Sequence, residues 1–184
     1  AGYGSAGERC MAISVAVPVG KGTADRLIAA LTPRVESLKI GPSTDASADF
    51  GPLVTKAHLE KVKGYVDQGV KEGATLVVDG RGFSMQGYEG GWYMGGCLFD
   101  NVTTDMTIYK EEIFGPVLSV VRAGTYEEAL AMINAHEYGN GTAIFTQDGD
   151  AARDFAARVE VGMVGVNVPI PVPLSYFTFG GWKR

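Results

Sequence analysis

Apolar residues along the chain alternate between two kinds of spacing. Apolar side chains recur at helical intervals in four segments, so we predict helices over 24–39, 55–72, 126–135 and 148–159. The second of these helices is expected to bury one face that carries Leu59, Val62, Val66 and Val70. Short apolar or β-branched runs bounded by Gly, Asp or Asn predict strands over 15–19, 74–78, 92–99, 116–121, 141–146 and 161–168.

Strands that alternate with helices of this length require crossover connections, which favour parallel pairing. We therefore expect an α/β fold with an open, twisted, mainly parallel sheet and helices on both faces. The chain has 184 residues, 46% of them hydrophobic, and shows neither a linker nor an internal repeat, so a single domain over 1–184 is predicted. Its longest apolar run, 13–19, is too short to cross a membrane.

The charges change which partners and compartments are expected. The chain has 16 Lys and Arg against 21 Asp and Glu, a net charge of −5, and they are scattered, which argues against nucleic acid or an anionic membrane as a partner. Two cysteines are too few for a disulfide framework, and no metal-ligand spacing occurs, so we expect no metal and a reducing, cytoplasmic location. His58 and His136 are predicted to be solvated.

The segment around Cys10 carries the first candidate chemistry. Residues 2–7 match G-x-G-x-x-G, but no strand precedes them, so a dinucleotide fingerprint is not expected. Cys10 follows in a glycine-rich approach, where backbone N–H groups would favour the thiolate and stabilise an oxyanion, and Arg9 adds positive charge. The alternative is a small buried hydrophobic residue, and the spacing alone leaves both interpretations open.

Two further segments are candidates for binding. In 110–117 two carboxylates, Glu111 and Glu112, precede a strand; a carboxylate at such a turn is well placed to accept hydrogen bonds from ribose hydroxyls, and Phe114 could cover a flat ring. Solvated surface carboxylates are the alternative. The proline-stiffened loop within 164–174 is expected either to wall a substrate pocket or simply to leave the sheet.

Three of these segments, in order, resemble the aldehyde dehydrogenase superfamily: 7–10, 112–116 and 138–146. The resemblance covers nearly the whole chain and implies the catalytic domain of that family. More particularly, Arg9 before Cys10, Met11 after it, and the segment 165–173 are similar to the methylmalonate-semialdehyde dehydrogenases, which acylate CoA.

The resemblance implies a role for each candidate residue. Cys10 would attack an aldehyde, with its own backbone N–H in the oxyanion hole, NAD would accept a hydride, and CoA would take the acyl group. Arg9 would pair with the carboxylate of the semialdehyde substrate. Glu112 would hold the nicotinamide-side ribose, with Phe114 packed beside it. The expected products are propionyl-CoA from methylmalonate semialdehyde or acetyl-CoA from malonate semialdehyde.

The sequence also departs from the family. Glu8 stands where Gln is usual, and its charge should oppose thiolate formation. The chain starts at Ala1 and ends on 180–184, so both ends are expected to be cut. The dinucleotide-binding domain, an oxyanion asparagine and an oligomerisation strand would then lie outside it.

Such a fragment would be inactive alone, and its parent would be a homo-oligomer, mitochondrial if eukaryotic. Three other functions stay open on the sequence. They are an aldehyde dehydrogenase that releases its product by hydrolysis, a stand-alone cysteine hydrolase and a non-enzymatic α/β module.

Overall fold

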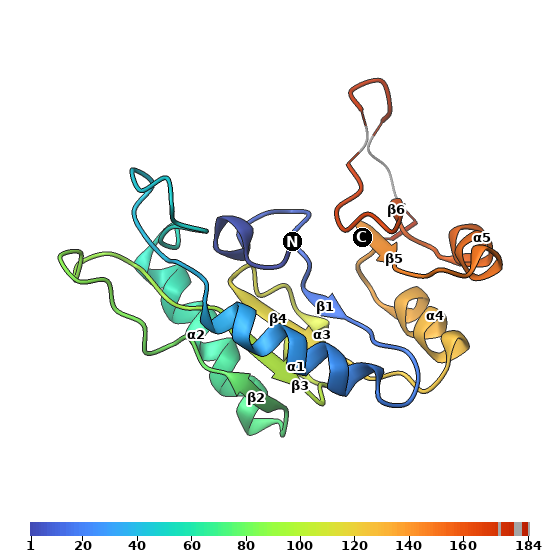
Figure 1. Cartoon of the computed structure of the whole chain (residues 1–184), viewed down its shortest axis with the longest axis horizontal. Helices are drawn as coiled ribbons and strands as arrows, with labels where there is room; N and C mark the ends of the chain where they lie inside the picture. The colour runs from blue at the N-terminus through green and yellow to red at the C-terminus, as the bar shows by residue number, and fades with distance from the viewer. Residues whose placement is uncertain (173, 179–181, 184) are drawn as a thin grey trace. The chain divides into compact units, whose positions relative to one another are not determined.

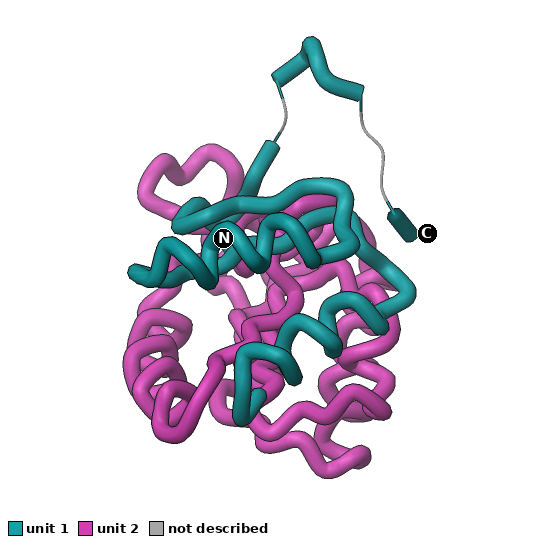
Figure 2. The backbone as a smooth tube through the Cα atoms, turned by 90° about the vertical axis from the view of Figure 1, so that its right-hand side faces the viewer, with its two compact units in different colours: residues 1, 123–184 teal, residues 2–122 magenta. Residues whose placement is uncertain are grey.

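The computed structural model describes residues 1–172, 174–178 and 182–183, which form two compact units. The larger unit comprises Gly2–Arg122, and the smaller comprises Ala123–Arg184 with Ala1 (Figure 2). The expectation of one domain over 1–184 concerns the chain as a whole and stays a prediction. No helix among the described residues is both long enough and apolar enough to cross a membrane.

The larger unit is built on a four-stranded sheet with the order β1-β4-β3-β2 (Figure 1). Strands β1 (Val15–Ala16), β4 (Val117–Val120) and β3 (Cys97–Asp100) pair in parallel with one another, and β2 (Thr75–Val78) pairs antiparallel with β3 at the edge. All four residues of β3 and all four of β4 are buried, as expected for parallel strands covered on both faces. The prediction of a mainly parallel sheet is confirmed.

Helices cover both faces of this sheet. Leu98 and Phe99 are adjacent on β3 and therefore point to opposite faces. Leu98 belongs to a core cluster that packs against Ile28 of helix α1 (Thr23–Glu36). The Phe99 ring instead lies 3.0 Å from the point where a Cβ on Gly69 of helix α2 (Lys56–Lys71) would sit. The two long helices therefore lie on opposite sides of β3.

Some details of the predicted elements are wrong, and the following three lie in the larger unit. Strand β1 ends at Ala16 instead of residue 19, and Pro18, which has no N–H to donate, follows closely. Strand β3 begins at Cys97 instead of residue 92, after a segment in which the Gly95 backbone packs against that of Gly80. On α2, Val70 is 46% exposed, and Gly69 takes the buried position because Phe99 and Ile108 fill the space of a side chain.

A one-turn helix, α3 (Thr107–Lys110), was not predicted, because a single turn is too short to show helical periodicity. Glu72, directly after α2, fixes its start. The Glu72 carboxylate accepts the Thr107 backbone N–H at 2.8 Å and the Thr107 hydroxyl at 2.5 Å. Hydrogen bonds from the Thr107 hydroxyl, the Gln68 amide and the Thr107 N–H hold the pKa of Glu72 below its usual value. Helix α3 leads directly into the segment that carries Glu112.

The smaller unit contains α4 (Tyr126–Ala135), β5 (Gly141–Ile144), α5 (Gly149–Arg158) and β6 (Met163–Val166). Strands β5 and β6 pair in parallel, and the unit has its own core of Leu130, Phe155, Val159 and Val161. Each strand is therefore connected to the next through a helix, as the alternating pattern predicted.

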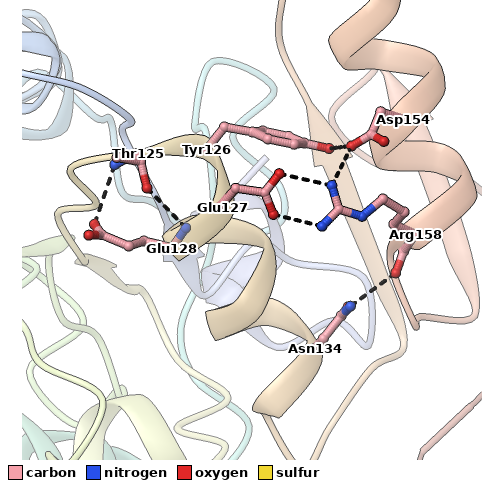
Figure 3. A network of polar contacts seen from close by, with 7 residues as sticks. All are labelled: Thr125, Tyr126, Glu127, Glu128, Asn134, Asp154 and Arg158. Carbon is pink, nitrogen blue, oxygen red and sulfur yellow. Dashed lines mark hydrogen bonds and ion pairs between the residues drawn. The ribbon is translucent and has the colours of Figure 1, made fainter.

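A polar network joins the two helices of this unit (Figure 3). The Arg158 guanidinium donates to both carboxylate oxygens of Glu127, at 2.9 and 2.6 Å, and to Asp154 at 2.9 Å. The Tyr126 hydroxyl donates to the same Asp154 at 2.7 Å. At the start of α4, Thr125 and Glu128 form a capping box that satisfies otherwise unpaired backbone N–H groups.

The loop after β6 starts with a tight turn at Asn167. Its φ of 57° is left-handed, and its side-chain amide accepts the Thr146 N–H and donates to the Thr146 carbonyl, each at 3.0 Å. A Cβ on Gly165 would lie 2.4 Å from the Val168 carbonyl oxygen, so this position requires glycine. The segment singled out at 165–173 is thus a strand-ending turn over its first residues, while Pro173 lies outside the described residues.

Candidate active site

The glycine-rich segment before Cys10 forms a short left-handed turn. Ser5, Ala6 and Gly7 have φ values of 53°, 56° and 71°, within a 3-10 helix spanning Gly4–Gly7. The next turn is closed by the Ala12 N–H, which donates to the Arg9 carbonyl at 3.0 Å. Cys10 lies exposed in this second turn. The G-x-G-x-x-G pattern thus forms a tight loop that presents Cys10, not the strand-turn-helix of a dinucleotide fingerprint.

The backbone of Gly7 packs directly against the loop that follows α3. A Cβ on Gly7 would lie 2.0 Å from the Gly115 carbonyl oxygen, a distance no side chain tolerates. Gly115 is in turn enclosed by α2, because a Cβ there would meet Val62 at 2.6 Å. Because neither glycine has a side chain, two loops lie in backbone contact. These are the Cys10 loop (residues 7–12) and the Glu112 loop (residues 111–116).

Phe114 has a left-handed backbone, with a φ of 57°, which is costly for a bulky residue. Its carbonyl oxygen lies 2.6 Å from Nε2 of His58. The two rings meet edge to face, with centroids 6.2 Å apart and an interplanar angle of 72°. Contacts to both its carbonyl and its ring therefore hold Phe114 in this conformation.

His58 was predicted to be a solvated surface histidine, and this is wrong. It lies in the first turn of α2, where its backbone N–H donates to the N-cap hydroxyl of Thr55 at 3.1 Å. Its side chain is only 16% exposed, and Nε2 also lies 3.3 Å from Oε1 of Glu8. This arrangement could not be predicted from the sequence, because the partners of His58 are far away in the chain and one is a backbone carbonyl.

Glu8 turns toward the N-terminal end of α2. Its carboxylate accepts the Val54 N–H at 3.2 Å and approaches His58, and the side chain is 14% exposed. Carboxylates are favoured at helix N-termini, where the helix dipole is positive. The Glu8 carboxylate, which stands where the family usually has Gln, is therefore in contact with the Val54 N–H and with His58.

The four predicted site residues line one hollow. Arg9 and Cys10 reach it from the first loop, and Glu112 and Phe114 from the second. Its cavity volume is about 60 Å³, and it opens to solvent. The sequence missed other lining residues, among them Ile13, Ile108 and Tyr109. Two of these three lie on α3, the element that was not predicted, and burial raises the pKa of Tyr109.

The charged groups at this hollow differ in their partners. Glu111 accepts a hydrogen bond from the Tyr65 hydroxyl at 2.6 Å, which ties it to α2. The neighbouring Glu112 is exposed and forms no ion pair among the described residues, and the same holds for Arg9. Glu112 and Arg9 are therefore exposed charged side chains at the hollow that no ion pair occupies among the described residues.

The second thiol has a different environment. Cys97 is buried in β3, and its sulfur accepts the Gly80 N–H at 3.3 Å. Burial raises the pKa of Cys97 to about 11, well above that of an ordinary thiol. Among the described residues, no group of three His, Cys, Asp or Glu side chains could hold a metal ion. The candidate chemistry therefore centres on Cys10.

The candidate nucleophile Cys10 and the facing loop of Glu112 thus lie in an α/β fold. The chain belongs to the aldehyde dehydrogenase family, whose family model matches residues 1–184. It is 65% identical over its whole length to a malonate-semialdehyde dehydrogenase of Pseudomonas aeruginosa. The chain spans 37% of the length of that relative.

Solved structures of aldehyde dehydrogenases are also similar to this chain. A Sinorhizobium meliloti protein, named as a methylmalonate-semialdehyde dehydrogenase and crystallised with NAD, is 69% identical with a TM-score of 0.97, over 99% of this chain and 37% of its own. The methylmalonate-semialdehyde dehydrogenase of Oceanimonas doudoroffii is 56% identical with a TM-score of 0.96, over 100% of this chain and 38% of its own. A Staphylococcus aureus betaine aldehyde dehydrogenase in complex with NAD+ is 32% identical with a TM-score of 0.93, over 99% and 36%.

Proposed function

We propose that this chain is the cysteine-bearing catalytic part of an NAD-dependent, CoA-acylating semialdehyde dehydrogenase that acts on malonate or methylmalonate semialdehyde. One observation carries the proposal: Arg9, Cys10, Glu112 and Phe114 line a single hollow although their two segments are distant in sequence. The names of the relatives, malonate- and methylmalonate-semialdehyde dehydrogenase, support the substrate class.

Cys10 is the proposed nucleophile. Its exposed sulfur bonds to the aldehyde carbon, and the carbonyl electron pair moves to oxygen, where the backbone N–H of Cys10 stabilises it. NAD, when bound, supplies the oxidant that takes a hydride from this adduct and leaves a thioester. The CoA thiolate then attacks the thioester carbon, and the bond to Cys10 breaks to return the free thiolate.

Arg9 is the proposed binding group for the substrate carboxylate. It is adjacent to Cys10 in the chain, lines the same hollow and is exposed. A guanidinium pairs well with a carboxylate because its planar N–H groups match the two oxygens. In a β-carboxy thioester the electrons of the broken C–C bond pass to the thioester carbonyl, so carbon dioxide leaves and a thioester enolate forms. A proton from water added to the enolate carbon then gives the acetyl or propionyl thioester.

The chain also has side chains that fit NAD. The Glu112 carboxylate is exposed at the hollow, so it can accept hydrogen bonds from the two hydroxyls of a ribose. Phe114, half-buried beside it, offers an aromatic edge to the same sugar. These two residues would hold the nicotinamide-side half of the cofactor. We propose that further polypeptide holds the other half, that the complete enzyme is a homo-oligomer, and that it works in the cytoplasm.

The test is NAD reduction by the natural polypeptide that carries this chain, with malonate semialdehyde, with and without CoA. We expect NADH and acetyl-CoA in the presence of CoA, and no steady-state turnover after Cys10→Ser. Arg9→Gln should raise KM for the semialdehyde at least tenfold, and raise KM for an aldehyde without a carboxylate far less. Release of a free acid at the same rate without CoA would favour hydrolytic deacylation instead, and an absence of NADH would reject the proposal.

A further inference from the structure

Three segments that are far apart in the sequence meet at the imidazole of His58. The first is the Cys10 loop, through Glu8, whose Oε1 lies 3.3 Å from Nε2. The second is the Glu112 loop, through the Phe114 carbonyl oxygen, 2.6 Å from the same nitrogen. The third is α2, which carries His58 in its first turn. One ring nitrogen therefore contacts both loops of the candidate active site.

The chemistry of the two partners fixes the hydrogen on this nitrogen. A carbonyl oxygen and a carboxylate oxygen only accept hydrogen bonds, so Nε2 has to carry a hydrogen in this arrangement. Both the neutral Nε2–H tautomer and the protonated ring satisfy this requirement. The hydrogen bond to the Phe114 carbonyl therefore does not depend on the charge of His58, whereas the contact with Glu8 is an ion pair only when the ring is protonated.

The imidazole is itself held rigidly. The N-cap hydroxyl of Thr55 accepts the His58 backbone N–H at 3.1 Å. The next turn of the helix is anchored in the core by Leu59 and Val62, which are 7% and 0% exposed. A donor on a packed helix can hold a loop that would otherwise relax. The helix therefore holds His58 in a fixed position, where both loops contact its side chain.

Phe114 is the residue that needs such support. Its left-handed φ of 57° is unfavourable for an aromatic residue and persists only where contacts maintain it. Losing the bond to His58 would remove one of the contacts that maintain this backbone, and Glu112 lies two residues earlier in the same segment. The placement of the Glu112 carboxylate therefore depends on the bond to His58.

We propose that His58 is a positioning residue: its Nε2–H holds the Phe114 carbonyl and the Glu8 carboxylate, and so sets the Glu112 loop against the Cys10 loop. It acts through these two residues and does not touch the substrate. The kinetic consequence rests on the proposed function, since it requires Glu112 to bind the ribose of NAD, whereas the structural consequence does not.

The test compares variants that remove or keep the donor. His58→Leu removes it, and His58→Asn leaves a polar side chain too short to reach the carbonyl. His58→Gln places an amide N–H near the position of Nε2. The matched control is Glu60→Gln, an exposed position two residues along the same helix. If His58→Leu fails to fold, His58→Asn provides the same comparison.

In the natural polypeptide that carries this chain, His58→Leu and His58→Asn should raise KM for NAD about fivefold, the effect of losing one hydrogen bond. KM for the semialdehyde should change less than twofold, and His58→Gln should restore KM for NAD to within twofold of wild type. A purely structural role would lower kcat and leave KM for NAD unchanged. That result, or a His58→Gln variant as impaired as His58→Leu, would overturn the inference.

Hydrogen–deuterium exchange of this chain separates the inference from the proposed function. His58→Leu should accelerate exchange in peptides covering 8–12 and 111–116, while His58→Gln and Glu60→Gln leave it near wild type. If the natural polypeptide reduces no NAD, the proposed function fails and the exchange result alone decides the role of His58. Unchanged exchange in both peptides of His58→Leu would reject it.

Discussion

Gly7 and Gly115 touch through their backbones, and no other residue type fits at Gly7. A Cβ there would lie 2.0 Å from the Gly115 carbonyl oxygen. Because these glycines belong to the Cys10 loop and the Glu112 loop, their contact brings the predicted nucleophile and the predicted ribose ligand to one hollow. The two loops can therefore lie this close together only because Gly7 and Gly115 have no side chains.

This contact makes Gly7→Ala strongly destabilising. The new methyl group would force the loops apart, and Ala would also adopt the unfavourable φ of 71°. We expect a loss of about 3 kcal/mol of unfolding free energy in urea denaturation. Gly4→Ala is the control, since a Cβ at Gly4 meets nothing within 4 Å. Equal effects at both positions would contradict this account of the contact.

Glu112 and Glu111 should differ in their effect on NAD binding. Glu112→Gln removes the exposed carboxylate proposed to accept the ribose hydroxyls, so KM for NAD should rise about tenfold through loss of charge-assisted hydrogen bonds. Glu111→Gln alters a carboxylate already bonded to the Tyr65 hydroxyl, and its effect should be smaller. Steady-state kinetics of the natural polypeptide decide the matter: a larger effect at Glu111 would reverse the assignment.

The two thiols should differ in their reaction with iodoacetamide. Cys10 is exposed, whereas Cys97 is buried and its pKa is raised to about 11, so about one Cys97 in a thousand is a thiolate at pH 8. Peptide mass spectrometry of the folded chain at pH 8 should therefore find Cys10 labelled at least tenfold faster. Denaturation in urea should remove the difference. Equal rates in the folded chain would show that Cys10 is not accessible.

Asp100 makes the stability of the larger unit depend on pH. Its side chain is 8% exposed, and Arg122 donates to its two oxygens from Nε at 3.0 Å and Nη2 at 2.6 Å. These hydrogen bonds hold the pKa of Asp100 below its ordinary value of 3.8. Because the folded-state pKa is the lower one, the stabilisation is fully present above about pH 4 and is lost as the pH falls through the folded-state pKa.

Asp100→Asn should therefore cost about 2 kcal/mol at pH 7, a moderate loss because Arg122 is 40% exposed. Its stability should also fall less than that of wild type between pH 4 and pH 2. Urea denaturation at a series of pH values measures both effects. Asp150→Asn serves as control, since its ion pair with Arg153 is fully at the surface. Parallel pH curves for wild type and Asp100→Asn would contradict the assignment.

The sequence predicted most of the elements because their apolar spacing is local. Helix α4 has the predicted bounds, and the alternation of strands and helices was sufficient to predict the mainly parallel sheet. Helix α3 was missed because one turn has no periodicity. Val70 was misplaced because helical spacing cannot tell whether the Gly69 or the Val70 position faces the core, which depends on the bulk of Phe99 across the interface.

The four candidate site residues were found from short motifs and from the resemblance, and the structure brings them to one hollow. His58 was missed for a different reason. Its partners are a carboxylate and a backbone carbonyl brought close only by folding, and backbone groups leave no trace in the sequence pattern. The left-handed Phe114 was likewise invisible, since no residue preference predicts an aromatic side chain there.

The side-chain amide of Asn167 affects the register in which β5 and β6 pair. By accepting from and donating to Thr146, it continues the hydrogen-bond ladder one step past the Ile144–Val166 pair. A slip of one residue that put Val168, which has no polar side-chain atom, in the place of Asn167 would lose both bonds. Two strands bury too little surface to fix their register by hydrophobic contacts alone. The side chain of Asn167 thus favours the correct register of β5 and β6 over one shifted by a residue.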